Sequence, residues 1–286
     1  MIPVRRLLAG AVLAVLLALG AALTLGRSDG ATRPNRFDER AAWAFLRQQV
    51  ALGPRPAGSR ASRRLAAILR SSIPRGRYQA VPGGLRNVIG TVPGRQPRRV
   101  VVVGAHYDTK DIPRFVGAND GASGTAVVRQ LARQIKPRQL RPTIVFVFFD
   151  GEEAPRGVPD SQFERYGMRG SKVAAPTLGH AEAAIVLDFV GDRQLSFPRE
   201  QNSDRALWNG LRRAAARVGQ GRHFPAREQG AVLDDHVPFI RVGVPAIDLI
   251  DFEFACWHRP CDNLAAVSRR SLDATGESVF ELLRSL

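Results

Sequence analysis

The stretch that decides the fold runs from Val101 to Glu153 and reads VVVGAHYDTKDIPRFVGANDGASGTAVVRQLARQIKPRQLRPTIVFVFFDGEE. Two apolar runs rich in β-branched and aromatic residues, 100–103 and 143–149, lie near its ends, and neither alternates with polar residues. Between them, 124–135 has the mixed composition of a helix. Unbroken apolar strands separated by a helix are typical of a parallel sheet that is covered on both faces. The stretch therefore predicts an α/β fold.

Polar residues crowd immediately after the two predicted strands. His106 and Asp108 follow the first, Glu152 and Glu153 follow the second, and Asp120 lies between them. Ligand sites in open α/β sheets lie just beyond the carboxyl ends of the strands. Four carboxylates in one crevice would raise one another's pKa values unless a cation were present. Imidazole nitrogen with carboxylate oxygen is a common zinc ligand set, so we expect a metal site.

Each of these motifs has a simpler interpretation when it is taken alone. An HxD pair is commonly a polar loop, adjacent glutamates are commonly solvated, and Asp120 could be a turn or N-cap residue. All three fall at strand ends within one stretch, which makes coincidence the poorer explanation. At a strand end, one of Glu152 and Glu153 can bind metal while the other moves protons.

The rest of the chain divides into three parts. Residues 1–26 open with two arginines and continue as an uncharged apolar run, which indicates a signal peptide or an N-terminal membrane anchor. Either one would place the remainder outside the cytoplasm, as an exported protein. Residues 27–35 are predicted to be a linker, and 36–286 form one catalytic domain. The net charge of +16 comes almost entirely from scattered arginines, so we expect no nucleic-acid partner.

Further elements and acids follow in the domain. We expect Asp188 at the end of a strand over 184–188, where it faces the site or caps a turn. In VLDDHVPF, Asp234 or Asp235 could cap a helix while the other acid faces the site. Other predicted helices cover 37–51, 59–72, 202–218 and 268–286; other predicted strands cover 87–92 and 244–250, with a hairpin turn over 93–99 that leads into the strand at Val100.

The series of motifs is more specific than any one of them. HYDTK, FVGANDGASG, FFDGEEA, VLDFVGD, VLDDHVPF and WH occur in this order, which resembles the M28 zinc peptidases and, among them, the glutaminyl cyclases. The resemblance extends from about Phe37 to the C-terminus. It implies a single α/β domain of the zinc aminopeptidase type, with a central, twisted, mixed but mostly parallel β-sheet flanked by helices. It also implies an antiparallel start to the sheet.

The resemblance assigns roles to residues. In the cyclase pattern Asp120, Glu153 and His258 hold one zinc ion, and Glu152 is the general acid/base. Asp188 and Asp234 are acids of the catalytic network, and Trp257 and Phe254 contact the substrate. In the two-zinc aminopeptidase pattern, His106 and Asp188 bind a second metal ion that Asp120 bridges, with Asp108 behind His106. Both residue sets are present, so one or two zinc ions remain open.

The implied activity is that of a glutaminyl-peptide cyclotransferase, an acyltransferase that converts the N-terminal glutamine of peptides to pyroglutamate and releases ammonia. The alternatives are a two-zinc aminopeptidase and a catalytically silent binding domain. Asp234 favours the cyclase, because the peptidases generally lack that first acid. The chain departs from the cyclases after Glu153, where APRGVPD lacks their tryptophan, so we expect a differently shaped substrate pocket.

The only cysteines, Cys256 and Cys261, flank Trp257 and His258. They lack the partners of a zinc finger. Because an export signal precedes the domain, a disulfide that closes this small loop is plausible. The expected partners are peptide or protein N-termini as substrates, and a membrane if the N-terminal segment is retained.

Overall fold

The computed structural model describes residues 36–286. The predicted signal peptide or anchor at 1–26 and the linker at 27–35 lie outside the described residues. Within 36–286, no helix is both long and apolar enough to cross a membrane.

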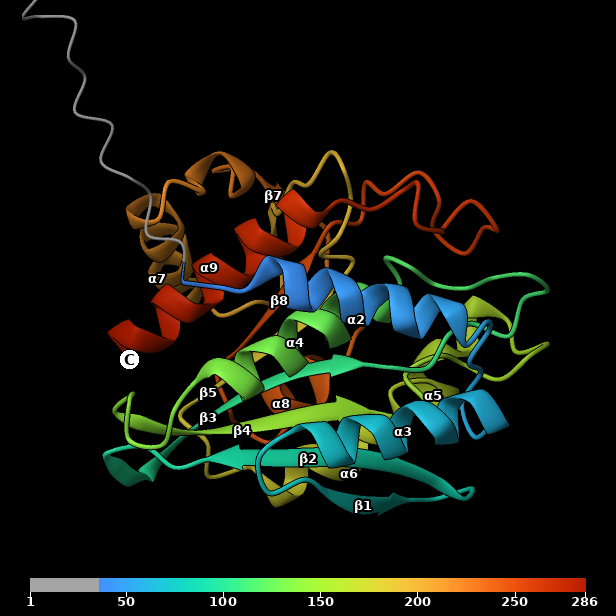
Figure 1. The fold of residues 1–286 in the computed structure, drawn as a ribbon, viewed down its shortest axis with the longest axis horizontal. Coiled ribbons are helices and arrows are strands. Elements are labelled where there is room, and N and C mark those ends of the chain that lie inside the picture. The colour runs from blue at the N-terminus through green and yellow to red at the C-terminus, as the bar shows by residue number, and fades with distance from the viewer. Residues whose placement is uncertain (1–35) are drawn as a thin grey trace, which may run out of the picture. The chain divides into compact units, whose positions relative to one another are not determined.

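The centre of the domain is a six-stranded mixed sheet (Figure 1). Its first strands are antiparallel to their neighbours, and the other pairs are parallel. This confirms the predicted mixed, mostly parallel sheet. In spatial order the strands are β1 (Arg77–Val81), β2 (Leu85–Val92), β4 (Pro142–Phe149), β3 (Gln96–His106), β5 (Ala183–Asp188) and β8 (Ala246–Ile250).

The hairpin predicted between β2 and β3 is wrong. β2 forms its hairpin with β1 and pairs on its other edge with β4, where Val92 lies opposite Ile144. β4 therefore lies between β2 and β3. All its residues are buried, which suits an interior strand with a partner on each edge. β1 is an edge strand in which only Val81 is buried, and no apolar run indicated it.

The two faces of the sheet are covered by different helices. Val101 and Val103 of β3 belong to the larger core, whereas Val100 and Val102 belong to the smaller core on the opposite face, as the two-residue period of a strand requires. The larger core packs against α2 (Glu39–Ala51), α3 (Arg60–Ser72), α4 (Ala122–Gln134), α7 (Arg205–Arg217) and α9 (Arg269–Ser285); the smaller packs against α6 (Arg169–Thr177) and α8 (Val237–Arg241).

Four of the long helices begin where a polar side chain accepts a hydrogen bond from one of their first amides. The side chain of Asp38 accepts a hydrogen bond at the start of α2, and Ser59, Asp204 and Ser268 do the same for α3, α7 and α9. The predicted helices over 37–51, 59–72, 202–218 and 268–286 are confirmed apart from a few terminal residues.

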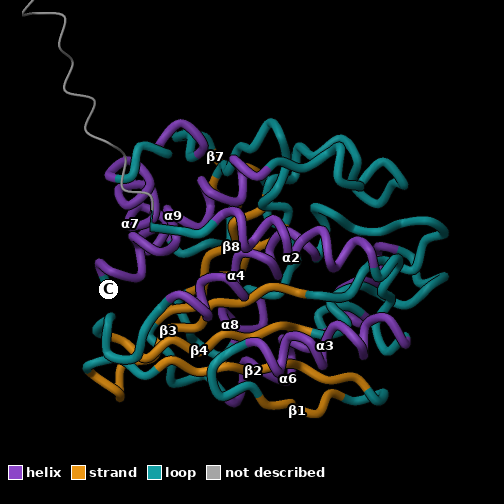
Figure 2. Tube along the Cα trace, viewed as in Figure 1, coloured by secondary structure: helices purple, strands orange, loops and turns teal. Residues whose placement is uncertain are grey.

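Loops gather beyond the carboxyl ends of β3 and β4, at the right of Figure 2. The segment 154–170 contains the short helices η1 (Asp160–Gln162) and α5 (Phe163–Tyr166). Short elements elsewhere are β6 (Arg199–Glu200), η2 (Gly221–His223) and β7 (Glu228–Gln229). This loop-rich end of the sheet is where the predicted site residues lie.

Candidate active site

The structure brings the predicted acids and imidazoles together at the carboxyl ends of the parallel strands. His106 ends β3, Asp188 ends β5, and Glu152 and Glu153 follow β4. The others come from loops: Asp120 precedes α4, Asp234 precedes α8, and Trp257 and His258 follow β8. The fold thus places residues from distant parts of the chain at one edge of the sheet, as the strand-end pattern predicted.

The first group of potential metal ligands is Asp120, Glu153 and His258. His258 Nε2 lies 3.3 Å from Glu153 Oε1 and 3.6 Å from Asp120 Oδ2. Ligand atoms about 2.0–2.1 Å from a tetrahedral zinc ion are about 3.3–3.4 Å apart. Asp120 Oδ2 is buried and has no hydrogen-bond partner. The spacing and the mixed nitrogen and oxygen donors therefore fit zinc.

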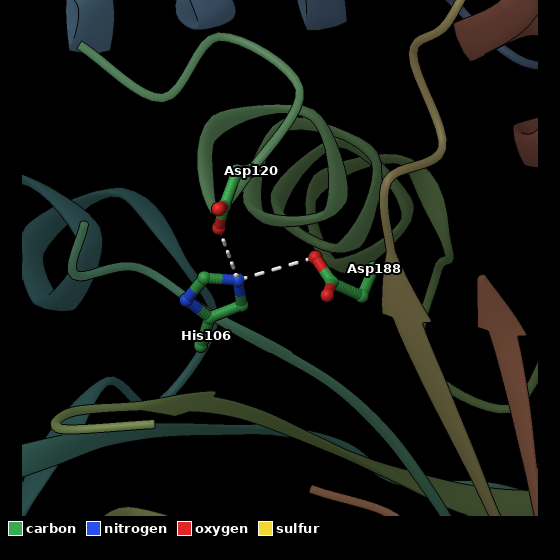
Figure 3. A group of neighbouring side chains, drawn as sticks. All are labelled: His106, Asp120 and Asp188. Carbon is green, nitrogen blue, oxygen red and sulfur yellow. Dashed lines mark hydrogen bonds and ion pairs between the residues drawn. The ribbon is translucent and has the colours of Figure 1, made fainter. Parts of the chain in front are cut away.

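A second group shares Asp120. His106 Nε2 lies 3.3 Å from Asp120 Oδ1 and 3.2 Å from Asp188 Oδ1 (Figure 3). Asp120 thus turns one oxygen toward each group, which is the arrangement that a bridging carboxylate needs. The donor atoms of the second group have a spacing that suits a metal ion, and so do those of the first group. The geometry therefore does not decide between one bound ion and two.

Asp108 orients the adjacent glutamates through their backbone. Its two carboxylate oxygens accept hydrogen bonds from the amides of Glu152, at 3.2 Å, and Glu153, at 3.3 Å. Its Oδ1 also lies 3.7 Å from His106 Nδ1. Asp108 thus lies beside Nδ1 of His106, and its contacts to the glutamate amides are an addition to what the sequence suggested.

Two left-handed glycines shape the turn that presents Asp120. Gly117 has φ +50°, and a Cβ there would lie 2.3 Å from the carbonyl oxygen of Asp120; Gly121 has φ +87°, and a Cβ there would lie 2.5 Å from that of Asp108. Both positions therefore require glycine. Gly121, not Asp120, is the N-cap of α4, so the alternative that Asp120 caps this helix is wrong.

His258 adopts a left-handed backbone conformation, with φ +51°. Non-glycine residues rarely adopt this conformation, and such positions cluster at functional sites. The structure joins Cys256 and Cys261 in a disulfide across this turn, with Cα atoms 5.4 Å apart, as the sequence suggested. The disulfide limits the freedom of the loop that carries His258.

The acids of the site have perturbed pKa values. Burial and the neighbouring Glu153 raise the pKa of Glu152 well above its usual range. The same two causes raise the pKa of Asp120 to about 8. Burial alone would also raise the pKa of Glu153, but its hydrogen bond with His258 lowers it. A bound divalent cation would offset this accumulation of negative charge.

Asp234 lies in a second buried acidic cluster behind the first. Burial and Asp188 raise its pKa to about 6. Among residues 36–286, neither carboxylate oxygen has a hydrogen-bond partner at ordinary geometry. His236 is fully buried, with its ring nitrogens 3.1 Å from Glu200 and 3.6 Å from Asp248. The N-cap of α8 is His236. The alternative that Asp234 or Asp235 caps that helix is therefore wrong.

A cavity of about 600 Å³ opens over the metal-ligand groups. Glu152, Asp188 and Asp234 line its inner part. Trp257 also lines it, with 40% of its surface exposed, and its ring stacks on that of His258 at 4.7 Å. Phe254 is only 6% exposed and stacks on Phe189 in a small core. It is not among the lining residues of the cavity, so its predicted contact with substrate would require movement.

Three lining residues were not singled out from the sequence. Lys110 Nζ lies 3.2 Å from Glu153 Oε2, so a cation neighbours a predicted metal ligand. The Phe252 ring lies 5.0 Å from that of Trp257, and Phe163 comes from the 154–170 loop. Lys110 belongs to the quoted motif HYDTK, which was the available signal. Phe252 and Phe163 belong to loops without a periodic pattern.

The chain matches known proteins over most of this domain. Residues 87–283 match the sequence profile of Peptidase family M28. A glutaminyl-peptide cyclotransferase from Bos taurus is 30% identical over an alignment of 226 positions, which covers 65% of this chain and 62% of that protein. The chain thus spans less than two thirds of the length of the curated relatives that it matches first.

Two solved structures show the same fold with opposite descriptions. A glutaminyl cyclase from Porphyromonas gingivalis superposes with a TM-score of 0.76 and 29% identity, covering 88% of this chain and 99% of its own. A Zn-dependent exopeptidase from Parabacteroides distasonis superposes with a TM-score of 0.78 and 29% sequence identity, covering 89% of this chain and 100% of its own. Overall similarity therefore does not separate a cyclase from an exopeptidase, and the distinction depends on individual residues.

Proposed function

The chain belongs to peptidase family M28, and we propose that it is a zinc-dependent glutaminyl-peptide cyclotransferase. It would convert the N-terminal glutamine of peptides and proteins to pyroglutamate and release ammonia. Relatives and solved structures with this description support the proposal, as does the arrangement of acids around Asp234. The substrates would be peptide or protein N-termini that reach the cavity.

One zinc ion is proposed to bind Asp120, Glu153 and His258, whose donor atoms have the spacing of zinc ligands. The chemistry that zinc supplies at this position is Lewis-acid polarisation of the γ-amide carbonyl of the substrate. Lys110 pairs with the other oxygen of Glu153, which leaves Glu153 Oε1 directed at His258. Asp120 and Glu153 are both buried, so the donor set is held in place by the surrounding fold.

Glu152 is proposed to move the proton. The α-amine of the substrate forms the new bond to the γ-carbonyl carbon, and the bond from that carbon to the amide nitrogen breaks. Glu152 takes the proton that the amine loses and returns it to the departing ammonia, so it is unchanged overall. Its carboxyl is buried, lines the cavity and has a raised pKa, all of which suit a group that holds a proton between two steps.

Asp234 carries the choice of cyclisation over hydrolysis. Its carboxylate lines the cavity and is buried, and within the described part of the chain neither oxygen has a hydrogen-bond partner at ordinary geometry. The neighbouring Asp248 has a pKa well above its usual range because of burial and the charge of Asp234, so a protonated Asp248 can donate to Asp234. Such an acid network beside Glu152 and Asp188 can accept the proton that an incoming ammonium group loses to become a neutral amine, whereas Glu152 takes the proton that the amine loses on attack.

The cavity also suits a reaction in which no water attacks. Aromatic side chains of Phe163, Phe252 and Trp257 line it, and their apolar surfaces would exclude water from a bound N-terminal glutamine. A hydrolase, by contrast, needs a water molecule at the scissile carbonyl. The lining therefore favours cyclisation.

The test is to incubate the purified protein with glutamine-initiated peptides and, separately, with aminoacyl amides. We expect pyroglutamyl peptide and ammonia in equal amounts from the first and no free amino acid from the second. Release of free amino acids without pyroglutamate would establish the aminopeptidase instead. Neither product from zinc-loaded protein would support the silent binding domain.

The two-zinc aminopeptidase remains the second candidate because of one observation. His106, Asp120 and Asp188 form a second group with ligand-like spacing, and Asp120 can bridge it to the first. In that case Glu152 would activate water. A silent domain is disfavoured because the residues of the catalytic centre are all present.

We also propose that the protein is exported and acts outside the cytoplasm. The apolar run at 1–26, as a signal peptide or membrane anchor, supports this, and so does the Cys256–Cys261 disulfide, since disulfides persist in oxidising compartments. Fractionation of cells, with the position of the mature N-terminus, tests whether the segment is cleaved or retained.

A further inference from the structure

Two proposed zinc ligands that are far apart in the chain, Asp120 and His258, are tied together by a third residue. Asp262 directly follows the disulfide-closed loop that carries His258. Its Oδ1 accepts a hydrogen bond from the amide of Asn119 at 2.7 Å, and its Oδ2 accepts one from the amide of Asp120 at 3.0 Å. Its backbone carbonyl accepts a third from Ala118 at 3.4 Å. One buried carboxylate thus binds consecutive amides of the turn that presents Asp120.

A cation holds the same turn from its other side. The guanidinium of Arg55 is fully buried and donates to the carbonyl oxygens of Val116, at 2.8 Å, and Gly117, at 3.2 Å. It also donates to the carbonyls of Gln49 and Gly53 at the end of α2. The first two carbonyls of the 116–120 turn therefore face a positive charge, while its last two amides face a negative one.

We propose that Asp262 and Arg55 are a positioning pair that fixes the 116–120 turn against the His258 loop and thereby sets the affinity of the metal centre for zinc. The inference rests on the proposed zinc site, though not on cyclisation. Asp262 and Arg55 would not touch the ion. They act through Asp120, whose carboxylate must direct one oxygen toward His258 and the other toward His106.

The reason is geometric. The Asp262 carboxylate satisfies two adjacent amides only when the turn and the loop lie in one relative position. An asparagine at this position could accept from one amide with its oxygen, but its NH₂ group would face the other amide. A buried backbone N–H without an acceptor is costly, so the turn would shift and carry Asp120 with it. Residues that orient metal ligands typically change metal affinity about 10–100-fold when they are mutated.

The experiment is Asp262→Asn in the full chain, with the zinc dissociation constant measured by chelator competition. Glu277→Gln is the matched control. Glu277 is also a buried carboxylate, and its Oε1 accepts hydrogen bonds from the consecutive amides of Arg36 and Phe37. It lies on α9, however, and holds no segment of the site. The melting temperature of metal-free protein is recorded for both variants.

We expect Asp262→Asn to weaken zinc binding about 10–100-fold. Glu277→Gln removes a buried carboxylate, but its side-chain oxygen can still accept from both amides, so its zinc dissociation constant should stay within twofold of the wild-type value. Equal zinc affinity in wild type and Asp262→Asn would overturn the inference, as would an equal loss of affinity in both variants. Zinc binding by a wild type that does not cyclise glutamine would overturn only the proposed activity. A wild type that binds no zinc would overturn the metal centre and this inference together.

Arg55→Lys is the second variant, for the case in which Asp262→Asn is obtained only as unfolded protein. A lysine keeps the positive charge but lacks the planar fork that reaches several carbonyls at once. We expect it to fold and to bind zinc more weakly than the wild type, by about tenfold, the lower end of the range for such orienting residues. A folded Arg55→Lys protein with wild-type zinc affinity would overturn the positioning role.

Discussion

The pair of variants Asp234→Asn and His106→Ala distinguishes the cyclase from the two-zinc peptidase. Asp234→Asn keeps the volume of the side chain but removes a carboxylate from the inner cavity. Asp234 does not belong to the Asp120, Glu153 and His258 group, so the zinc content should stay unchanged. If its carboxylate accepts the proton of the incoming amine, the turnover number should fall about 10²–10⁴-fold, as for a lost acid–base group.

His106→Ala should behave differently in a one-zinc cyclase. The variant removes the imidazole that lies 3.2 Å from Asp188 and 3.3 Å from Asp120. Hydrogen bonds to charged groups contribute about 1.5–3 kcal/mol each, so the loss should appear mainly as lower stability. Asp188 keeps its hydrogen bond from the amide of Phe189. We expect one zinc per chain and a smaller loss of turnover than in Asp234→Asn.

The assay measures the ammonia and the free amino acid released from a glutamine-initiated peptide, together with the zinc content per chain, on wild type and both variants. Three results together would contradict the one-zinc cyclase. They are two zinc ions per chain in the wild type, loss of one ion and most activity in His106→Ala, and full activity in Asp234→Asn. That order would assign the second group as a working metal site and identify the protein as an aminopeptidase.

Three further predictions follow from single positions. Glu152→Gln should retain zinc and lose about 10²–10⁴-fold in turnover, and near-normal turnover would show that another group moves the proton. Gly121→Ala should lower both stability and zinc affinity, because its Cβ would lie 2.5 Å from the Asp108 carbonyl oxygen. The control, Gly83→Ala, has a similar φ of +82° but open space around it, so it should cost less stability and leave zinc binding unchanged. Equal losses of stability for the two variants in denaturant titrations would refute the steric argument. Asp251→Asn tests how the stability depends on pH. Burial raises the pKa of Asp251 from 3.8 to about 7. Between these two pH values the native state therefore retains a proton that the unfolded state releases, and the stability of the native state falls as the pH rises. The stabilisation of Asp251→Asn relative to wild type should therefore grow from about pH 4 to pH 7 and then level off, and a difference that does not vary with pH would contradict the assignment.

The sequence predicts the strand ends well because two local signals coincide there. Unbroken apolar runs identify β3 and β4, and each run stops at polar residues such as His106 and Glu152. The parallel arrangement then follows from the helix between the runs. What brings the ligands together is therefore encoded locally, in the order of strand, polar residue and helix.

The order of the strands in the sheet was less accessible. Insertion of β4 between β2 and β3 depends on long-range pairing, which no local pattern records. The aromatic lining shows the same limit. Phe252 and Phe254 both belong to the segment DFEF, yet Phe252 lines the cavity and Phe254 packs inside. The turn that contains Phe252 and Phe254 sets the direction in which each ring points. Because a turn has no regular period, the sequence does not show which ring faces the cavity.

The remaining ambiguity over the metal count has a physical origin in one imidazole. Asp188, Asp108 and Asp120 surround His106 and raise its pKa well above its usual range, although burial alone would lower it. A protonated His106 therefore places a positive charge between Asp120 and Asp188, and a metal ion bound to a neutral His106 would place one there too. In the one-zinc cyclase the positive charge between Asp120 and Asp188 would be the proton on His106. In the two-zinc aminopeptidase it would be a second metal ion. Since Asp120 turns its other oxygen to His258 in both cases, the first zinc site is common to them, and only the charge held beside His106 and the role of Asp234 separate cyclisation from hydrolysis.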